Sequence, residues 1–316
     1  MTQLLDNNLK TPTKYFQDAT PLLSKPQQLL EKADREGYLF FKNVMPKDKI
    51  LELRKQILEI LNRRNMLDKR YDLMDGIADV AEINRYTPEQ FSIGGNGFPL
   101  DLYFDIQKLR AFHAIAHEPR LLDVLRILFQ AEPFVHPKTI ARVVMPHRDV
   151  AATPSHQDYV YIQGSQQFWT VWFPLGDCPM QLGGLSILEG SHKAGIYDVS
   201  PARGAGNFES ILCGLDHDWV VGDYAAGDVV MFNSHTVHKA LPSQMKERIR
   251  LSCDFRYQSI HEEIADYTLA PHVPNSWEEI YENWDEHDPL KYYWQQQDMK
   301  CTPWAPEMLR NRPKIC

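Results

Sequence analysis

Two residues with metal-binding side chains lie close together in the stretch Thr153–Ile162. His156 and Asp158 are two positions apart in a segment that we expect to be extended. Side chains alternate between the two faces of an extended strand, so this spacing directs the imidazole and the carboxylate to one face. One further histidine would complete two nitrogens and one carboxylate around a divalent metal, the facial arrangement of non-heme Fe(II) sites.

A later part of the chain offers the third ligand. The strand-like run Val229–Phe232 leads to His235 and then His238, and the register counted from Gly227 favours His238. The following stretch, 248–255, alternates polar and apolar residues, which predicts a strand with one face towards a polar cavity. Its arginines could hold the distal carboxylate of a 2-oxo dicarboxylate, because a guanidinium matches a carboxylate with two parallel donors.

Other histidines compete for a metal. The stretch His147-Arg148-Asp149 repeats the spacing of the first pair, but it follows Met145-Pro146 in a turn-like setting and we favour His156 and Asp158. We interpret His192 as structural. His113 and His117 are one helical turn apart but lack the glutamate order of a metalloprotease helix, so we expect packing or surface roles for them.

The surrounding pattern predicts helices first and strands later. Helical spacing marks 26–36, a helix opened by Pro46, and the stretches 109–117 and 119–129, whereas 66–106 is irregular and contains a glycine-rich loop at 94–97. From residue 134 the chain becomes a series of short strands, which is typical of a sandwich or barrel. The expected strands are 134–145, 159–163, 168–175, 184–188, 219–221, 229–232 and 248–257.

Composition limits the partners and the compartment. The chain has 316 residues, a formal net charge of −8 and five cysteines without C-x-x-C spacing. An acidic chain does not suit nucleic acid or an anionic membrane as its main partner, and scattered free thiols are typical of a reducing compartment. With neither a signal-like nor a transmembrane-length apolar run, we expect a cytoplasmic protein with a small-molecule substrate; its oligomeric state is left open.

An ordered set of motifs over about 100 residues resembles the phytanoyl-CoA dioxygenase family of Fe(II)- and 2-oxoglutarate-dependent oxygenases. The motifs are His156-x-Asp158, Trp172-Phe173-Pro174-Leu175, Gly183-Gly184-Leu185, Glu189-Gly190-Ser191-His192-Lys193, Gly227-Asp228-Val229-Val230, His238 and the strand that begins at Arg248.

The resemblance implies a mainly β fold with flanking helices, a double-stranded β-helix of the jelly-roll, cupin-like kind. It implies one oxygenase domain over 1–316. This divides into an N-terminal arm (1–22), helical support with a pocket insert (23–133), the β-helix core (134–258) and an aromatic, helical tail (259–316).

The resemblance also implies roles for individual residues. Iron would be bound by His156, Asp158 and His238, which are thereby the catalytic centre, and 2-oxoglutarate by an arginine after the distal histidine. Arg248 fits that role by position, and Arg250, of the same strand parity, is its rival. Further co-substrate contacts are expected from Trp172, from Lys138 or its strand neighbour Arg142, and from Ser243, because the relatives' hydroxyl position is Ala240 here.

The expected activity is oxidation of an unactivated C–H bond in a small metabolite or natural product by dioxygen, with release of succinate and CO₂ and with stimulation by ascorbate. The intact carboxylate of Asp158 argues against halogenation. Two alternatives are a non-catalytic binding or sensing member of the fold and a cupin-like metalloenzyme without 2-oxoglutarate. All three ligands and the arginine are present in the sequence, which favours the enzyme.

Overall fold

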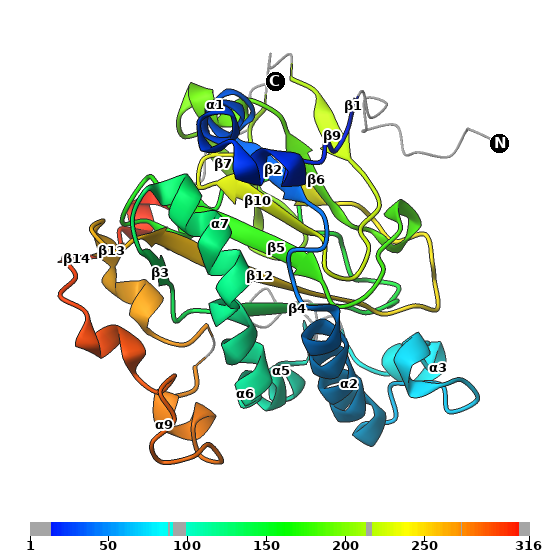
Figure 1. Cartoon of the computed structure of the whole chain (residues 1–316). Coiled ribbons are helices and arrows are strands. Elements are labelled where there is room, and N and C mark those ends of the chain that lie inside the picture. Colours follow the sequence, from blue (N-terminus) through cyan, green and yellow to red (C-terminus); the bar gives the residue numbers. More distant parts are fainter. Residues whose placement is uncertain (1–13, 88, 91–98, 213–216, 273, 310–316) are drawn as a thin grey trace.

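The structure is a computed structural model that describes residues 14–87, 89–90, 99–212, 217–272 and 274–309 (Figure 1). The glycine-rich stretch 94–97 lies outside the described residues. Within them, no helix combines the length and the apolar character needed to cross a bilayer.

Two β-sheets form the centre of the described chain. The larger sheet has the strand order β2-β10-β5-β12-β3, with β4 also paired to β12, and the smaller has the order β1-β9-β6-β11. The larger sheet comprises β2 (Tyr38–Phe41), β3 (Pro133–Val135), β4 (Ile140–Val144), β5 (Trp169–Pro174), β10 (Val229–Asn233) and β12 (Arg250–Ser259). The smaller comprises β1 (Lys14–Tyr15), β6 (Leu185–Leu188), β9 (Trp219–Val221) and β11 (His238–Ala240). Two strand pairs lie outside them, β7 (Val199–Pro201) with β8 (Phe208–Ser210) and β13 (Ile264–Ala265) with β14 (Cys301–Thr302).

The two sheets face each other across an apolar layer. Trp172 and Val230 from the larger sheet share a buried cluster with Leu185, Ile187 and Val220 from the smaller one. Strands with alternating side chains can bury one face in such a layer and use the other for a second core. The expected β core of jelly-roll type is therefore confirmed.

Helices cover the outer face of the larger sheet. Leu39, Val171 and Phe255, whose side chains alternate with the inward-facing ones, belong to a core cluster that also contains the apolar residues of these helices. Figure 1 shows α7 crossing the sheet near β12 and β3, which it contacts. The helices are α1 (Pro26–Glu36), α2 (Lys47–Arg63), α3 (Val80–Ile83), α5 (Leu100–Gln107), α6 (Arg110–Ala114) and α7 (Pro119–Phe129).

The C-terminal tail packs through its aromatic residues. The Ser276 side chain accepts a hydrogen bond from the Glu279 backbone N–H, and the Glu279 carboxylate accepts one from the Ser276 N–H, so a capping box opens α9 (Trp277–Ile280). Trp284 and Trp294 join Phe134 in a buried cluster. The tail thereby covers the end of β3.

Two predicted strands are wrong in detail. The segment 159–163 is not a strand but the helical turn α8 (Tyr159–Ile162), in which the N–H groups of Tyr161 and Ile162 donate to the Asp158 carbonyl. The expected strand 134–145 is divided into β3 and β4. The β-branched and aromatic residues at 159–162 favour a strand, but this local preference yields to the tertiary environment.

Gly37 ends α1 in a left-handed conformation, with φ of 74° and ψ of 3°. A Cβ at this position would lie 2.2 Å from Nδ1 of His192, a contact that cannot be kept without movement. The imidazole of His192 in turn pairs through Nε2 with the carbonyl oxygen of Asp34 in α1. The predicted structural role of His192 is consistent with this close packing against the helix end.

We expect Gly37→Ala to lower the free energy of unfolding by more than about 2 kcal/mol, because the left-handed backbone alone costs an alanine about 1–2 kcal/mol and His192 must also be displaced. Urea denaturation measures the change. The matched control is Gly190→Ala: Gly190 has φ of 76° and ψ of −4°, and its added Cβ would meet only an ordinary contact at 3.5 Å. Equal losses in the two variants would contradict a role for the His192 contact.

Candidate metal centre

The backbones of His156 and His238 pair with each other. Each N–H donates to the other residue's carbonyl, at N···O distances of 2.9 Å for His156 and 3.0 Å for His238. This antiparallel bridge joins the segment before α8 to the start of β11. As a consequence the two imidazoles lie side by side, with ring centroids 4.2 Å apart.

Asp158 completes the group from the position immediately before the helical turn α8. Its Oδ1 atom is 3.7 Å from Nε2 of His156 and 3.8 Å from Nε2 of His238. One ligand atom from each of the three residues lies within 4.8 Å of the others, and all three residues are buried. The structure brings together the three residues that the sequence predicted as ligands, but Asp158 has helical backbone angles, so the expected extended geometry is wrong.

Local hydrogen bonds fix which imidazole nitrogens are free. Nδ1 of His156 lies 2.8 Å from the carbonyl oxygen of Pro154, and Nδ1 of His238 lies 3.1 Å from that of Thr236. A carbonyl can only accept, so Nδ1 carries the proton and Nε2 offers its lone pair. Burial, reinforced by His238, lowers the pKa of His156 to about 3, and burial also lowers that of His238, so both rings are neutral.

The second oxygen of Asp158 is held by two side chains that the sequence analysis missed. Oδ2 accepts hydrogen bonds from Thr170 Oγ1 and from Arg256, whose Nη2 lies at 2.9 Å and Nε at 3.2 Å. Burial is the largest influence and would raise the pKa of Asp158, but the charge of Arg256 and smaller contributions from its other neighbours, including the Thr170 hydrogen bond, together outweigh it and the pKa is lowered. The alternation of polar and apolar residues in 248–255 extends to Arg256, which follows Asp254 by two residues. This pattern could have predicted that Arg256 faces the same polar interior.

A third missed residue, Asp254, links Arg256 to Arg142. Its Oδ2 lies 3.0 Å from Arg256 Nη2 and 3.2 Å from Arg142 Nη2. Burial opposes ionisation of Asp254, but the two guanidinium groups lower its pKa. A continuous row of alternating charges therefore runs from Arg142 to Asp158.

Arg250 presents a guanidinium towards the same interior. The residue is 4% exposed; its Nη1 donates to Ser252 Oγ at 3.2 Å, and its Nε is buried without a hydrogen-bond partner among the described residues. Its Cζ lies 5.8 Å from the ring centroid of Trp172, a buried residue of β5. A buried donor without a partner is costly, and a carboxylate ligand would satisfy it.

Two expected co-substrate contacts lie elsewhere. Arg248 precedes β12 in a bridge with Ile77, and its Nε faces the carbonyl oxygen of Asp75 at 3.4 Å. The exposed Ser243 turns back on its own loop, where its hydroxyl pairs with the backbone of Met245. Strand parity could not separate Arg248 from Arg250, because the strand begins only at Arg250.

Lys138 is buried near Arg256 but is engaged by the C-terminal tail. Its ammonium donates to the carbonyl oxygen of Pro271 at 2.8 Å and lies 3.9 Å from the ring centroid of Tyr267. Burial, with a smaller contribution from the charge of Arg256, lowers the pKa of Lys138 to about 7. The expected co-substrate contact is thus replaced by an attachment between the sheet and the tail.

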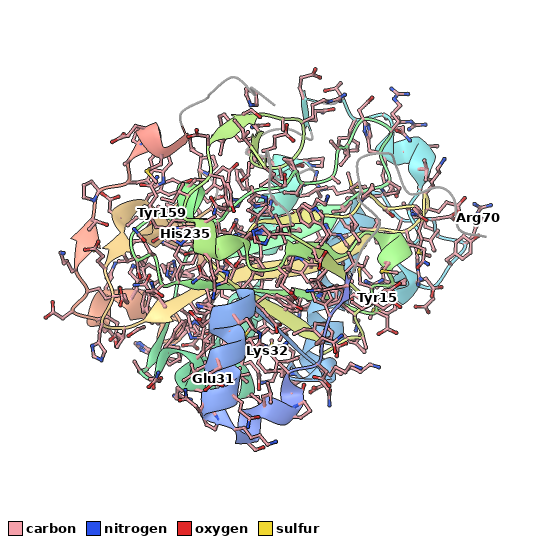
Figure 2. The ribbon with its side chains drawn as sticks, turned by 90° about the horizontal axis from the view of Figure 1, so that it is seen from above. Tyr15, Glu31, Lys32, Arg70, Tyr159 and His235 are labelled. Carbon is pink, nitrogen blue, oxygen red and sulfur yellow. The ribbon has the colours of Figure 1, made fainter. Side chains whose placement is uncertain are left out.

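The competing histidines lie outside the triad. Nδ1 of His147 accepts from the Asp149 N–H in a local turn. His235 turns towards Tyr159, with ring centroids 4.7 Å apart (Figure 2). His113 and His117 are largely buried, and burial lowers the pKa of each to about 4, consistent with packing roles.

Comparisons with known proteins agree with this geometry. The family profile described as phytanoyl-CoA dioxygenase (PhyH) matches residues 33–249, more than half of the chain. The chain belongs to the phytanoyl-CoA dioxygenase family. The predicted family and the predicted dioxygenase class of oxidoreductase are therefore confirmed.

Individual relatives of this family member are distant. It is 24% identical over 270 residues to 1-deoxypentalenic acid 11-beta-hydroxylase of Streptomyces arenae, covering 81% of this chain and 89% of the relative. The Streptomyces exfoliatus enzyme of the same name is also 24% identical, and the match again covers 81% of this chain and 89% of the relative. Among solved structures, the non-heme monooxygenase ThoJ superposes with a TM-score of 0.51 at 17% identity, covering 74% of this chain and 78% of that one, and so shares the fold.

The donor set fits ferrous iron. Two neutral imidazole nitrogens and one carboxylate oxygen from three buried residues are a facial triad, and the outer oxygen of the carboxylate is already satisfied by protein donors. The unpartnered Nε of Arg250 fits the distal carboxylate of 2-oxoglutarate by the same reasoning.

We expect His156→Ala to lower Co(II) or Fe(II) affinity by at least about 100-fold, since it removes a ligand and not only a supporting contact. Isothermal titration calorimetry measures the affinity. His147→Ala is the matched control, because His147 belongs to the competing pair with Asp149. It should leave the metal affinity within about twofold of the wild-type value. The opposite ranking would contradict the triad.

The low pKa of Lys138 predicts a pH-dependent contribution to stability. The unfolded lysine titrates near 10.4, so between pH 7 and that value the unfolded chain binds more protons and stability rises with pH. Relative to Lys138→Met, the wild-type free energy of unfolding should therefore increase by about 2 kcal/mol from pH 7 to pH 9. Urea denaturation of the metal-free proteins tests this, and a difference independent of pH would contradict it.

Proposed function

We propose that this protein is an Fe(II)- and 2-oxoglutarate-dependent dioxygenase that hydroxylates, or otherwise oxidises at an unactivated C–H bond, a small organic metabolite or natural product. The observation that carries the proposal is the buried group of His156, Asp158 and His238 beside the unpartnered guanidinium of Arg250. The names of the Streptomyces relatives, which are hydroxylases of a natural-product acid, support the same reaction type.

Three side chains of the protein would bind the metal. His156, Asp158 and His238 would hold the metal through two imidazole nitrogens and one carboxylate oxygen. When bound, iron and 2-oxoglutarate activate dioxygen, with succinate and CO₂ as co-products and one oxygen atom transferred to the substrate. Ascorbate would keep the metal reduced.

Arg250 would bind the distal carboxylate of 2-oxoglutarate, with Trp172 as a wall beside it. The guanidinium stays charged although burial lowers its pKa, and its fork suits a carboxylate. The apolar layer around Val230 and Ile187 excludes water from this side. Exclusion of water strengthens the ion pair and protects a reactive centre from side reactions.

The hydrogen bonds to Nδ1 of both histidines and to Oδ2 of Asp158 would keep the ligands in place through the reaction. Arg256 and Thr170 bind Oδ2 of the carboxylate, so that Oδ1 would be the oxygen available to a metal. Fixed ligands leave the remaining metal positions to co-substrate and dioxygen, which is the requirement for ordered binding.

Succinate production from 2-oxoglutarate by the purified, iron-loaded protein tests the function, with and without candidate natural-product substrates. Succinate that depends on iron and is stimulated by a substrate supports it. A protein that binds iron and 2-oxoglutarate but yields no succinate with any candidate would instead favour a non-catalytic binding role.

We expect Arg250→Gln to weaken 2-oxoglutarate binding by about 10- to 100-fold, because a charged hydrogen-bonded pair is replaced by a neutral one. Titration of the metal-loaded protein under anaerobic conditions measures it. Arg248→Gln is the matched control and should stay within about twofold. If Arg248→Gln has the larger effect, the assignment of the anchor is reversed.

A further inference from the structure

Gln163, the residue that follows the helical turn α8, has an unusual backbone conformation. Its φ is 60° and its ψ is −159°. This region is essentially restricted to glycine, and other residues remain in it only where the surrounding structure holds them there. Because Gln163 is buried, the groups that hold it lie inside the protein.

The C-terminal tail holds Gln163 through a reciprocal pair of hydrogen bonds. Nε2 of the side-chain amide donates to the carbonyl oxygen of Ala305 at 2.9 Å, and Oε1 accepts from the Ala305 N–H at 2.7 Å. Nε2 also lies 3.2 Å from the Val160 carbonyl oxygen within the turn. One residue earlier in the tail, the indole Nε1 of Trp304 donates to the Tyr161 carbonyl oxygen at 2.9 Å.

Another part of the tail encloses the chain where it leaves α8. Gly164 has φ of 74°, and a Cβ there would lie 2.6 Å from the backbone nitrogen of Ala265. The Ser165 N–H donates to the Glu263 carbonyl oxygen at 2.9 Å. Since β13 pairs with β14, the two parts of the tail that contact the end of α8 are also joined to each other.

The other end of α8 adjoins a candidate metal ligand. The carbonyl oxygen of Asp158 accepts the N–H groups of Tyr161 and Ile162, so the turn that contacts the tail also fixes the backbone of Asp158. The Tyr161 ring packs edge-on against His156, with 5.8 Å between ring centroids. A turn of four residues is too short for its two ends to move independently. A shift at its end would therefore disturb the surroundings of two candidate ligands.

We propose that packing of the C-terminal tail against α8 is coupled to metal binding, with Gln163 and Trp304 as positioning residues for Asp158. The inference rests on the metal-binding part of the proposed function. The tail contributes to the metal centre without supplying a ligand, because its contacts with α8 fix the direction in which Asp158 is presented to the two histidines. Such coupling is reciprocal, so a bound metal must also strengthen the packing of the tail.

The first test measures Co(II) affinity by calorimetry in the wild type, Gln163→Ala and Trp304→Phe. Alanine at 163 lacks the amide that holds the strained backbone, so the affinity should fall about tenfold, as expected for two lost hydrogen bonds. Phenylalanine at 304 keeps an aromatic ring but loses one hydrogen bond, so the affinity should fall about fivefold. These losses are partial, because the Tyr159 N–H still donates to the Ser234 carbonyl oxygen.

The matched control is Trp277→Phe. Trp277 lies in the same tail, and its Nε1 donates to the Leu269 carbonyl oxygen at 2.9 Å, the same kind and length of bond as that of Trp304. None of the hydrogen bonds found for Trp277 among the described residues reaches α8. The control should leave the Co(II) affinity within about twofold of the wild-type value, and thermal unfolding of the metal-free proteins checks that each variant is folded.

The reciprocal test uses the unaltered protein and follows amide hydrogen exchange by mass spectrometry. Saturating Co(II) should slow exchange in a peptide covering 300–306 about fivefold or more, the same factor by which loss of the tail contacts weakens metal binding. Exchange in a peptide covering α9 should change by less than about twofold. This peptide is the internal control, because a general stabilisation by the metal would slow both peptides equally.

Two results would overturn the inference while leaving the proposed function intact. One is that Gln163→Ala and Trp304→Phe, both folded, bind Co(II) no more weakly than Trp277→Phe. The other is that Co(II) slows exchange equally in the two peptides or in neither, and this result decides if the variants do not fold. A wild type that binds no Co(II) would overturn both the inference and the proposed function.

Discussion

The reciprocal backbone pairing of His156 and His238 is the interaction on which the candidate metal centre depends. It brings together two segments distant in sequence, and it does so through main-chain groups that every residue except proline supplies. Once it is formed, each imidazole is oriented by a carbonyl two residues earlier in its own segment. The geometry of the two histidines therefore follows from main-chain hydrogen bonds.

The carboxylate ligand is positioned in a different way. Asp158 begins a helical turn, and its outer oxygen is held by Thr170 and Arg256 from adjacent strands of the larger sheet, which are paired in register. The polar face of β12 therefore carries both the arginine that supports Asp158, Arg256, and the candidate co-substrate anchor, Arg250. Ser252 and Asp254 lie between them on the same face. Because the strand is buried on both faces, its polar side chains must find partners inside the molecule.

The sequence was sufficient for the family and the fold class, because ordered motifs and short strand patterns are local signals, and the same motifs named the three candidate ligands that the structure brings together. It was insufficient where the outcome depends on where a strand begins or what covers it. Arg248 and Arg250 share a parity, and only the start of β12 separates them. Lys138 was expected to contact the co-substrate, but its ammonium contacts Tyr267 and Pro271 of the C-terminal tail. The helical turn after Asp158 likewise runs against the strand preference of its residues.

The three candidate ligands come from two segments, before α8 and at β11, that only the folded chain brings together. A metal bound there has no equivalent site in the unfolded chain, so its binding free energy adds to the free energy of folding. At a free metal concentration of 100 times the dissociation constant this amounts to about 2.7 kcal/mol. The candidate metal centre would then also act as a cross-link between the smaller sheet and the segment leading to α8, and metal supply would influence how much of the protein is folded.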